Sequence, residues 1–437
     1  MKKHLITLIV LVVTITVNAQ KDKVNKLVNE NKTHLIEVFK DFHQNPELGF
    51  MEVRTSKIIA TELKDLGYKV IEGIGKTGVV GILENGDGPT VMYRADMDCN
   101  SVKEVTGLAY ASTKTVKIAD GSEVPVMHAC GHDAHITWLL GIAKVMAEMK
   151  KAWSGTLVLV AQPAEESIEG ARAMVDDGMY EKGVPEPDYL FGMHTAPLST
   201  GTVNFEKGPR MAGTDQLDVT FYGIGGHGSS PHLAKDPVLM AATAVVQYQF
   251  IVSRAINPLN AAVLTVGSIQ AGSDNNVIPA SALVKINLRW YKESDRDLMF
   301  KAIERINKSI AMTYNMPQDL YPITKYKGWA FPLVNDSSLV DRIRPVVEKV
   351  LGEKGIITGF PPTMASEDFH HLVIKNKAPK YLYMFFGTAK PSHFEQAQKE
   401  GKMFPYFPHN GNYQVDVDAI PLGVKVATKA ILEMFKK

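Results

Sequence analysis

The stretch Met127-His-Ala-Cys-Gly-His-Asp-Ala-His135 holds three histidines, one of the chain's two cysteines and an aspartate within nine residues. An apolar run with helical spacing follows it over residues 136–149. Thiolate and imidazole groups are ligands that divalent transition metals prefer. Because only Gly131 separates Cys130 from His132, the two cannot lie on successive turns of a helix. The pattern therefore predicts a metal-binding loop just before a helix. A buried free cysteine beside ordinary loop histidines is the alternative, and a metal site needs further ligands from elsewhere in the chain.

Carboxylates follow the predicted strands on both sides of this stretch. A strand at 90–93 runs into Asp96 and Asp98, and a strand at 156–161 is followed by Glu165 and Glu166. Open α/β sheets place their chemistry at the carboxyl ends of strands. Paired carboxylates after a buried strand are costly unless a positive charge neutralises them, as a metal would. One glutamate would then be a ligand and the other a general base. Turns or helix caps explain the aspartates otherwise, and a solvated loop explains the glutamates.

A third strand, predicted at 189–193, delivers His194 at its end. Three successive strands that end in candidate site residues favour one common site. After residue 328 the α/β pattern returns, and it contains Glu367 and His409. These two residues lie far from the first motifs in sequence, as the last ligand of a discontinuous domain would.

The pattern between these two parts is that of a second domain. Strands are predicted at 216–222, 261–270, 283–290 and 321–326, with helices at 237–255 and 296–314. This β-α-β-β-α-β order is ferredoxin-like, so the segment reads as an insertion whose long strands offer an edge for a second subunit. Arg289 closes one strand and is placed to reach an anionic substrate; a surface ion pair is the alternative. The glycines around His227 lack the Lys-Ser/Thr of a phosphate loop.

The N-terminus predicts export. Lys2 and Lys3 precede an apolar core at 5–17 and a small-residue cleavage site ending at Ala19, and this core is too short to span a bilayer. Without this segment about 418 residues remain, which exceeds one typical core and suggests two domains. They carry 46 basic and 47 acidic residues, a net charge of −1, so nothing recommends nucleic acid or an anionic membrane as a partner.

The two cysteines of an exported chain raise the question of a disulfide between Cys99 and Cys130. A domain of this size does not need the bond, and Cys130 is better used as a metal-bound thiolate. We therefore expect no disulfide.

Taken together, the motifs resemble the M20 family of metallopeptidases, and within it the amidohydrolase branch of hippurate, N-acyl-amino-acid and plant auxin-conjugate hydrolases. The resemblance runs from about Phe42 to the C-terminus. It rests on eight segments: His43-Gln-Asn-Pro-Glu-Leu-Gly, Arg94-Ala-Asp-Met-Asp, Met127-His-Ala-Cys-Gly-His-Asp, Gln162-Pro-Ala-Glu-Glu, Gly192-Met-His, Gly225-Gly-His, Asn276-Val-Ile-Pro and Ser366-Glu-Asp-Phe.

The resemblance implies an α/β fold in which a metal-dependent exopeptidase-like catalytic domain carries an inserted ferredoxin-like α+β dimerisation (lid) domain. The expected divisions are a signal peptide at 1–19, catalytic domain at 20–207 and 328–437, and insertion at 208–327. The resemblance also implies two divalent metal ions, Zn, Mn, Co or Ni, with the ligands Cys130, His132, Glu166, His194 and His409.

The remaining roles come from the same resemblance. Glu165 would be the general base, and Asp96 would orient a ligand. His227 would contact the substrate in the site of a partner subunit, so the inserted domain is expected to form a homodimer. Arg289 or Asn276 would hold the substrate carboxylate.

The expected function is an exported, metal-dependent amidohydrolase that cleaves the amide bond of small N-acyl amino acids of the hippurate kind with a metal-activated water. A dipeptidase or carboxypeptidase with the same site is the alternative among enzymes. A non-catalytic exported binding protein is the alternative from another class. That protein would have lost its base or its ligands, and all of them are present here.

Overall fold

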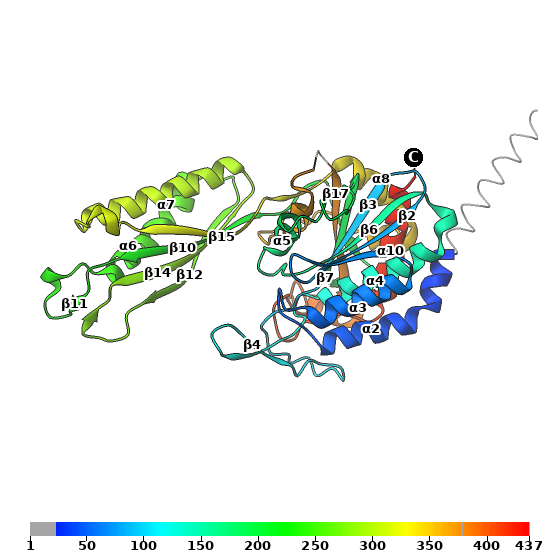
Figure 1. The fold of residues 1–437 in the computed structure, drawn as a ribbon, viewed down its shortest axis with the longest axis horizontal. Helices are drawn as coiled ribbons and strands as arrows, with labels where there is room; N and C mark the ends of the chain where they lie inside the picture. The colour runs from blue at the N-terminus through cyan, green and yellow to red at the C-terminus, as the bar shows by residue number, and fades with distance from the viewer. Residues whose placement is uncertain (1–22, 377–378, 437) are drawn as a thin grey trace, which may run out of the picture. The chain divides into compact units, whose positions relative to one another are not determined.

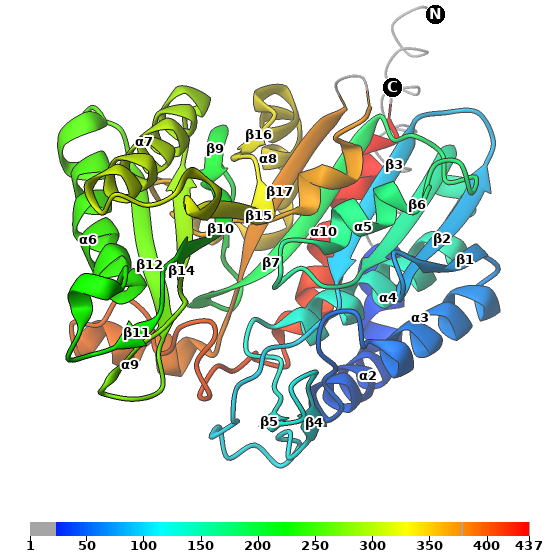
Figure 2. The same ribbon diagram turned by 60° about the vertical axis from the view of Figure 1, so that its left-hand side comes forward.

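The structure is a computed structural model that describes residues 23–376 and 379–436. The predicted signal peptide and its cleavage site lie outside these residues. The described chain divides into two compact units (Figures 1 and 2). The first comprises the chain up to Gly208, Asn335–Phe360 and the chain from Asp368 onward. The second comprises Pro209–Val334 and Pro361–Glu367.

A seven-stranded sheet forms the centre of the first unit. In spatial order its strands are β1 (Lys69–Ile74), β2 (Gly78–Asn85), β6 (Gly155–Gln162), β3 (Thr90–Asp96), β7 (Tyr189–Ser199), β17 (Lys380–Ala389) and β8 (Val203–Asn204). The four strands β6, β3, β7 and β17 are parallel, and the outer strands pair antiparallel. Parallel strands are covered on both faces and read as continuous apolar runs, which is how the sequence of β6 reads.

Helix α4 is the central helix of the layer that covers one face of this sheet. It packs against α2, α3 and α10, and α10 also packs against α8, whereas α5 contacts β6 on the other side of the sheet (Figure 2). A Cβ atom on Gly141 would lie 2.5 Å from Val424, so the glycine permits the close approach of α4 and α10. The described helices of this unit include α2 (Lys32–Gln44), α3 (Val53–Asp65), α4 (His132–Glu148), α5 (Gly170–Asp176), α8 (Ser337–Leu351), α9 (Pro391–Lys399) and α10 (Ala419–Met434).

The second unit is a four-stranded antiparallel sheet with two helices and its own apolar core. Its elements are β10 (Gly213–Tyr222), α6 (Pro237–Phe250), β12 (Ala262–Ala271), β14 (Ser281–Trp290), α7 (Glu293–Thr313) and β15 (Ile323–Ala330). The spatial order is β12-β14-β10-β15. The chain order and the sheet order are those of the ferredoxin-like fold, as the sequence predicts. Short two-stranded pairs complete the chain: β4 (Thr115–Lys117) with β5 (Glu123–Pro125), β9 (Gly208–Met211) with β16 (Leu333–Asn335), and β11 (Gly226–His227) with β13 (Val277–Ile278).

Two expected boundaries are wrong. The predicted end of the insertion at residue 327 falls inside β15, and the second unit continues to Val334 and includes 361–367. The ladder between β10 and β15 is irregular between Asp215 and Leu217 but resumes with the pairs of Trp329 and Ala330, so the strand continues beyond its predicted end at residue 326. Strand β7 likewise does not end before His194. It runs on to Ser199 because its parallel pairing with β17 continues.

Candidate metal centre

The loop that contains Cys130 and Gly131 leads directly into α4, which begins at His132, and it is fixed against β7. Gly131 has a φ of 81°, in the left-handed region that favours glycine. A Cβ atom at this position would lie 2.5 Å from Oγ1 of Thr195, which leaves no room for a side chain. The Thr195 hydroxyl donates a hydrogen bond to the Cys130 carbonyl at 2.7 Å. The loop therefore presents the thiol and the first imidazole of α4 in a fixed arrangement.

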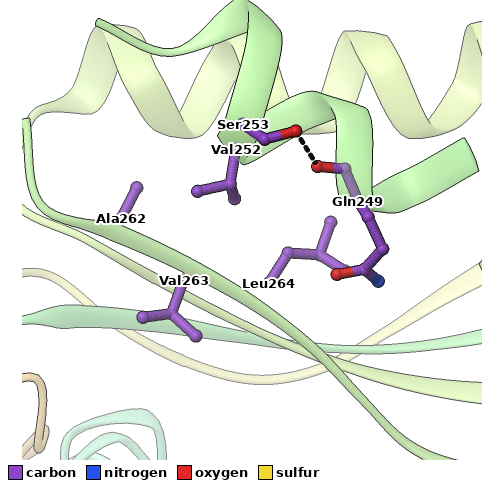
Figure 3. A pocket seen from close by; sticks show the side chains of 6 residues that line it. All are labelled: Gln249, Val252, Ser253, Ala262, Val263 and Leu264. Carbon is purple, nitrogen blue, oxygen red and sulfur yellow. Dashed lines mark hydrogen bonds between the residues drawn. The ribbon is translucent and has the colours of Figure 1, made fainter. Parts of the chain in front are cut away.

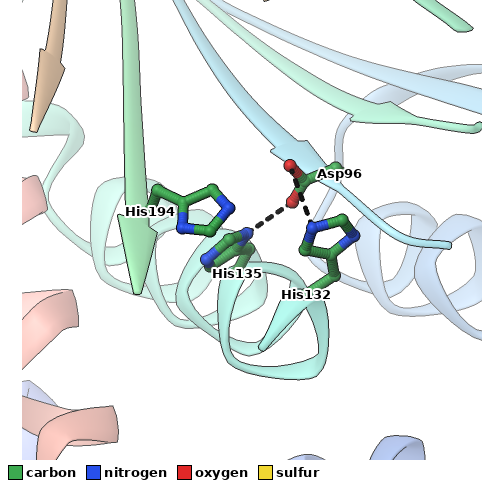
Figure 4. Close-up of side chains that lie close together, drawn as sticks. All are labelled: Asp96, His132, His135 and His194. Carbon is green, nitrogen blue, oxygen red and sulfur yellow. Dashed lines mark hydrogen bonds and ion pairs between the residues drawn. The ribbon is translucent and has the colours of Figure 1, made fainter. Parts of the chain in front are cut away.

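Asp96, His132, His135 and His194 form a cluster where the ladder between β3 and β7 ends (Figure 4). Asp96 is fully buried, and its Oδ2 accepts a hydrogen bond from Arg94 at 2.7 Å. Burial alone would raise the pKa of Asp96, but Arg94, His132 and His135 hold it well below its usual range. The carboxylate is therefore ionised in the folded chain.

His135 is held at both ring nitrogens. Its Nδ1 is hydrogen-bonded to Asp96, and its Nε2 accepts the backbone N–H of Thr195 at 2.8 Å. Although its atoms lie within reach of the cluster, no lone pair is left for a metal. His135 therefore orients Asp96 and is not itself a ligand.

His194 and His132 present free nitrogens to the site. Nδ1 of His194 lies 2.7 Å from the backbone carbonyl oxygen of Thr195 and donates to it, so that Nε2 carries the lone pair. That Nε2 lies 3.5 Å from Sγ of Cys130. His132 is fully buried, and among the described residues neither ring nitrogen makes a hydrogen bond of acceptable geometry, although Nδ1 lies 3.3 Å from Oδ1 of Asp98. Its Nε2 lies 3.8 Å from Oε1 of Glu166.

Cys130, Glu166 and His409 form an adjoining group of donors. Nε2 of His409 lies 3.3 Å from Oε2 of Glu166. The backbone of His409 has a φ of 63° and donates its N–H to the carbonyl of Ala129 at 2.8 Å. A non-glycine residue at positive φ persists only where the surroundings impose it, and such residues gather at functional sites.

The loop after β6 supplies both glutamates. Ala164 has a φ of 48°, and Glu165, which follows it, is only 6% exposed. Glu165 and Glu166 each bring a carboxylate oxygen close to His132. The structure thus gathers all five predicted ligands, Cys130, His132, Glu166, His194 and His409, together with Glu165 and Asp96.

The donors fit a metal. Within the site, four buried side-chain atoms of the described residues make no hydrogen bond: Nδ1 and Nε2 of His132, Oδ1 of Asp98 and Oε1 of Glu166. Leaving such atoms unpaired is costly, and a divalent cation would satisfy those that face it. A thiolate, imidazoles and a carboxylate together suit Zn²⁺ and its first-row neighbours. Cys99 and Cys130 are both free thiols. Burial raises the pKa of the Cys130 thiol, and a bound metal would reverse this by taking the thiolate.

Comparison with known proteins identifies the family. Residues 92–433 match the peptidase family M20/M25/M40. The chain belongs to this family. A hippurate hydrolase from Campylobacter jejuni is 41% identical over 75% of the chain and 82% of its own length. A thermostable carboxypeptidase 2 from Saccharolobus solfataricus is 34% identical over 92% of the chain and 96% of its own length.

A solved structure shares the fold. It is that of a Bacillus subtilis protein described as a dinuclear metal-binding peptidase of the M20 family, with a TM-score of 0.71, 24% identity, and coverage of 93% of this chain and 99% of the other. The M20 chain described here falls in the amidohydrolase branch and is a metal-dependent hydrolase of amide bonds.

The predicted substrate residues of this M20 chain all lie in its inserted unit. His227 is exposed in β11, and its Nδ1 accepts the backbone N–H of Ser229 at 3.1 Å. Asn276 is exposed directly before β13. Arg289 donates through Nε to Asn287 at 2.7 Å and through Nη1 to the hydroxyl of Ser366. Asn287 and Ser366 are neutral residues of the same unit as Arg289.

Sequence reasoning missed the role of His135. His132 and His135 are three positions apart in α4 and therefore share one face of the helix, a signal that was available. The hydrogen bond from the Glu166 N–H to Oδ2 of Asp98, at 3.0 Å, has no such signal, since it joins two loops that are distant in the chain.

Proposed function

We propose that the chain is an exported amidohydrolase that uses two divalent metal ions to cleave the amide bond of N-acyl amino acids. The observation that carries the proposal is the position of Glu165. It is buried, and its carboxylate lies close to His132 and Glu166, two of the five proposed metal ligands. A carboxylate beside a metal-bound water is the arrangement required for general-base hydrolysis.

The chain's own residues divide the work between them. Two ions held by the five ligands would supply an activated water and polarise the substrate carbonyl. Glu165 accepts the proton from that water and then donates it to the leaving nitrogen. Asp96, fixed by Arg94 and His135, keeps the surrounding imidazoles in place. We assign stabilisation of the tetrahedral oxyanion to His227 of a second copy of the chain.

The acyl amino acid is favoured by the relative named hippurate hydrolase. The relative named carboxypeptidase supports the second candidate, cleavage of a peptide bond next to a free carboxylate at the same site. A panel of N-acyl amino acids and dipeptides decides between them. The chelated protein is assayed with Zn²⁺, Mn²⁺, Co²⁺ or Ni²⁺, and kcat/KM is compared across substrates. Hydrolysis of neither class with any metal would refute the proposal.

A second copy of the chain would cover the exposed apolar face of the inserted unit. Strand β12 is an edge of the four-stranded sheet, and α6 exposes Leu239, Val246 and Phe250. The helical stretch Pro237–Ala255 is long and apolar enough to cross a membrane by length and composition alone. Only 28% of its apolar 18-residue window is buried, so most of it is exposed in a single copy of the chain. In a homodimer this face would be paired rather than exposed.

A pocket of about 320 Å³ lies between the end of this helical stretch and the start of β12 (Figure 3). Val252 and Leu264 are among its lining residues, so apolar side chains of a second copy would find space there. Phe250→Asp is expected to convert the dimer to a monomer in analytical ultracentrifugation. A wild-type chain that sediments as a monomer would contradict the dimer.

Export remains part of the proposal because the segment that predicts it lies outside the described residues. Cleavage near Ala19 would leave a mature chain that begins close to Gln20. N-terminal sequencing of the protein recovered from its native compartment tests this. An intact N-terminus in the purified protein would contradict it.

A further inference from the structure

The segment around His43-Gln-Asn-Pro-Glu-Leu-Gly49 has no function in the site as described so far. It lies against the chain that leaves β3: the Cys99 N–H donates to the carbonyl of Glu47 at 2.9 Å, and Leu48 forms a bridge with Cys99. Its end also meets the glutamate loop, because a Cβ atom on Gly49 would lie 3.0 Å from Cα of Ala164. The segment therefore packs directly beneath the loop that carries Glu165.

Glu52, three residues further on, forms a specific bond to that loop. Its side chain is fully buried. Oε1 accepts the backbone N–H of Ala164 at 2.9 Å, and Oε2 accepts the hydroxyl of Thr77 at 2.6 Å. Ala164 is the residue at a φ of 48°, a conformation that a non-glycine residue keeps only under external constraint. The bond from Glu52 supplies such a constraint.

A second buried carboxylate, that of Asp98, binds the backbone on the other side of Glu165. Oδ2 of Asp98 accepts the backbone N–H of Glu166 at 3.0 Å. The N–H groups of the residues immediately before and after Glu165 are therefore both bound by carboxylates from other segments. Because a buried backbone N–H without a partner is costly, one such bond on either side of Glu165 fixes the backbone from which its side chain projects.

We propose that Glu52 is a positioning residue for the general base, which it holds in line with the metal site through the N–H of Ala164. This inference rests on the proposed function in one respect, that Glu165 is the base. Asp98 performs the same task on the other side but also lies 3.3 Å from Nδ1 of His132, so replacing it would disturb a ligand. The side chain of Glu52 bonds to Ala164 and Thr77, neither of which is a proposed metal ligand. Glu52 is therefore the better residue to test.

The experiment compares Glu52 with a matched carboxylate of the same segment. Glu47 also accepts two groups, the backbone N–H of Arg54 at 3.0 Å and of Thr55 at 2.8 Å, but both belong to the start of α3. Glu52→Met removes the acceptor and keeps the length, whereas Glu52→Gln keeps a carbonyl oxygen for Ala164 and an amide that faces the Thr77 hydroxyl. Glu47→Met is the control for a purely structural loss.

In the metal-loaded enzyme we expect Glu52→Met to lower kcat about 100-fold, the scale of a misplaced catalytic group, with KM and metal content unchanged. Glu52→Gln should recover most of the loss, and Glu47→Met should keep the wild-type kcat. Amide hydrogen exchange over residues 163–168 should be faster in Glu52→Met than in the wild type and in Glu47→Met. If Glu52→Met does not fold, Glu52→Asp takes its place, because it keeps the carboxyl group and withdraws the oxygens by one methylene.

The outcomes separate the two proposals. A wild-type kcat in Glu52→Met or Glu52→Asp, an equal loss in Glu47→Met, or unchanged exchange over 163–168 would overturn the role of Glu52 while leaving the hydrolase in place. A wild-type enzyme without hydrolase activity would overturn the proposed function. The exchange measurement would then still report whether Glu52 holds the loop.

Discussion

Nε2 of His409 lies 3.3 Å from Oε2 of Glu166, although the whole inserted unit separates the two residues in the chain. The two carboxylate oxygens of Glu166 thus face two different histidines, Oε2 facing His409 and Oε1 facing His132. Glu165, the residue before it, lies close to His132 but is not grouped with Cys130 and His409. Two adjacent glutamates therefore have different surroundings, and different consequences are expected from replacing them.

Glu165→Gln should abolish turnover and leave the metal content intact, since the amide keeps the shape but cannot accept the proton. Glu166→Gln should lose metal instead, because an amide is a poor substitute for a charged ligand. Metal is measured by elemental analysis after gel filtration, and kcat is measured on the same samples. The opposite pattern would mean that the roles of the two residues are reversed.

The two thiols should differ in their response to metal. Cys99 and Cys130 are both buried, and burial raises the pKa of each thiol, that of Cys99 well above its usual value. Since the thiolate is the reactive form, native metal-free protein should react slowly with a thiol reagent at both positions. Adding Zn²⁺ should protect Cys130 alone, and Cys130→Ser but not Cys99→Ser should lose metal. A stoichiometric disulfide in active, metal-loaded protein would contradict this assignment.

His43 should make stability depend on pH. Burial alone would lower the pKa of His43, but hydrogen bonds to Asp133 at 2.6 Å and Glu104 at 3.1 Å raise it from 6.5 to about 9. The protonated ring therefore stabilises the folded chain fully below pH 6.5, and this contribution is lost as the pH rises through 9. At about 1.4 kcal/mol per pKa unit it amounts to on the order of 3 kcal/mol.

The measurement is the free energy of unfolding in urea for wild-type and His43→Gln protein, both kept in excess chelator so that metal binding does not contribute. The difference between them should be largest at pH 6 and should shrink steadily toward pH 9.5. A difference that stays constant over this range would show that His43 is not charged in the folded chain.

Complementation tests whether His227 acts across a dimer. His227→Ala and Glu165→Gln should each be nearly inactive as homodimers. In a mixed dimer one site would combine an intact Glu165 with an intact His227 from the other copy. Refolding the two variants together should restore activity, approaching one working site per heterodimer. No recovery in verified heterodimers would exclude the arrangement in trans.

A metal site was predictable from the sequence because Cys130, His132 and the pair of glutamates lie in short motifs beside a strand or a helix. The choice of Glu166 over Glu165 as a ligand, and the inclusion of His409, came from the family resemblance. The hydrogen bonds that orient these donors were not predictable. Glu52 and Ala164 meet through a fold that joins segments distant in the chain, and no periodicity encodes that contact. The partner of Arg289 was not predictable for the same reason. Ser366 lies in the segment Pro361–Glu367, which belongs to the inserted unit although it comes later in the chain.

The order of synthesis follows from the position of β17. This strand belongs between β7 and β8, yet the ribosome makes it only after the entire insertion. Until then β7 has no partner on one edge and is a template for pairing with other chains. The final ligand, His409, emerges later still. A nascent or truncated chain that stops before Lys380 is therefore expected to aggregate and to bind metal weakly.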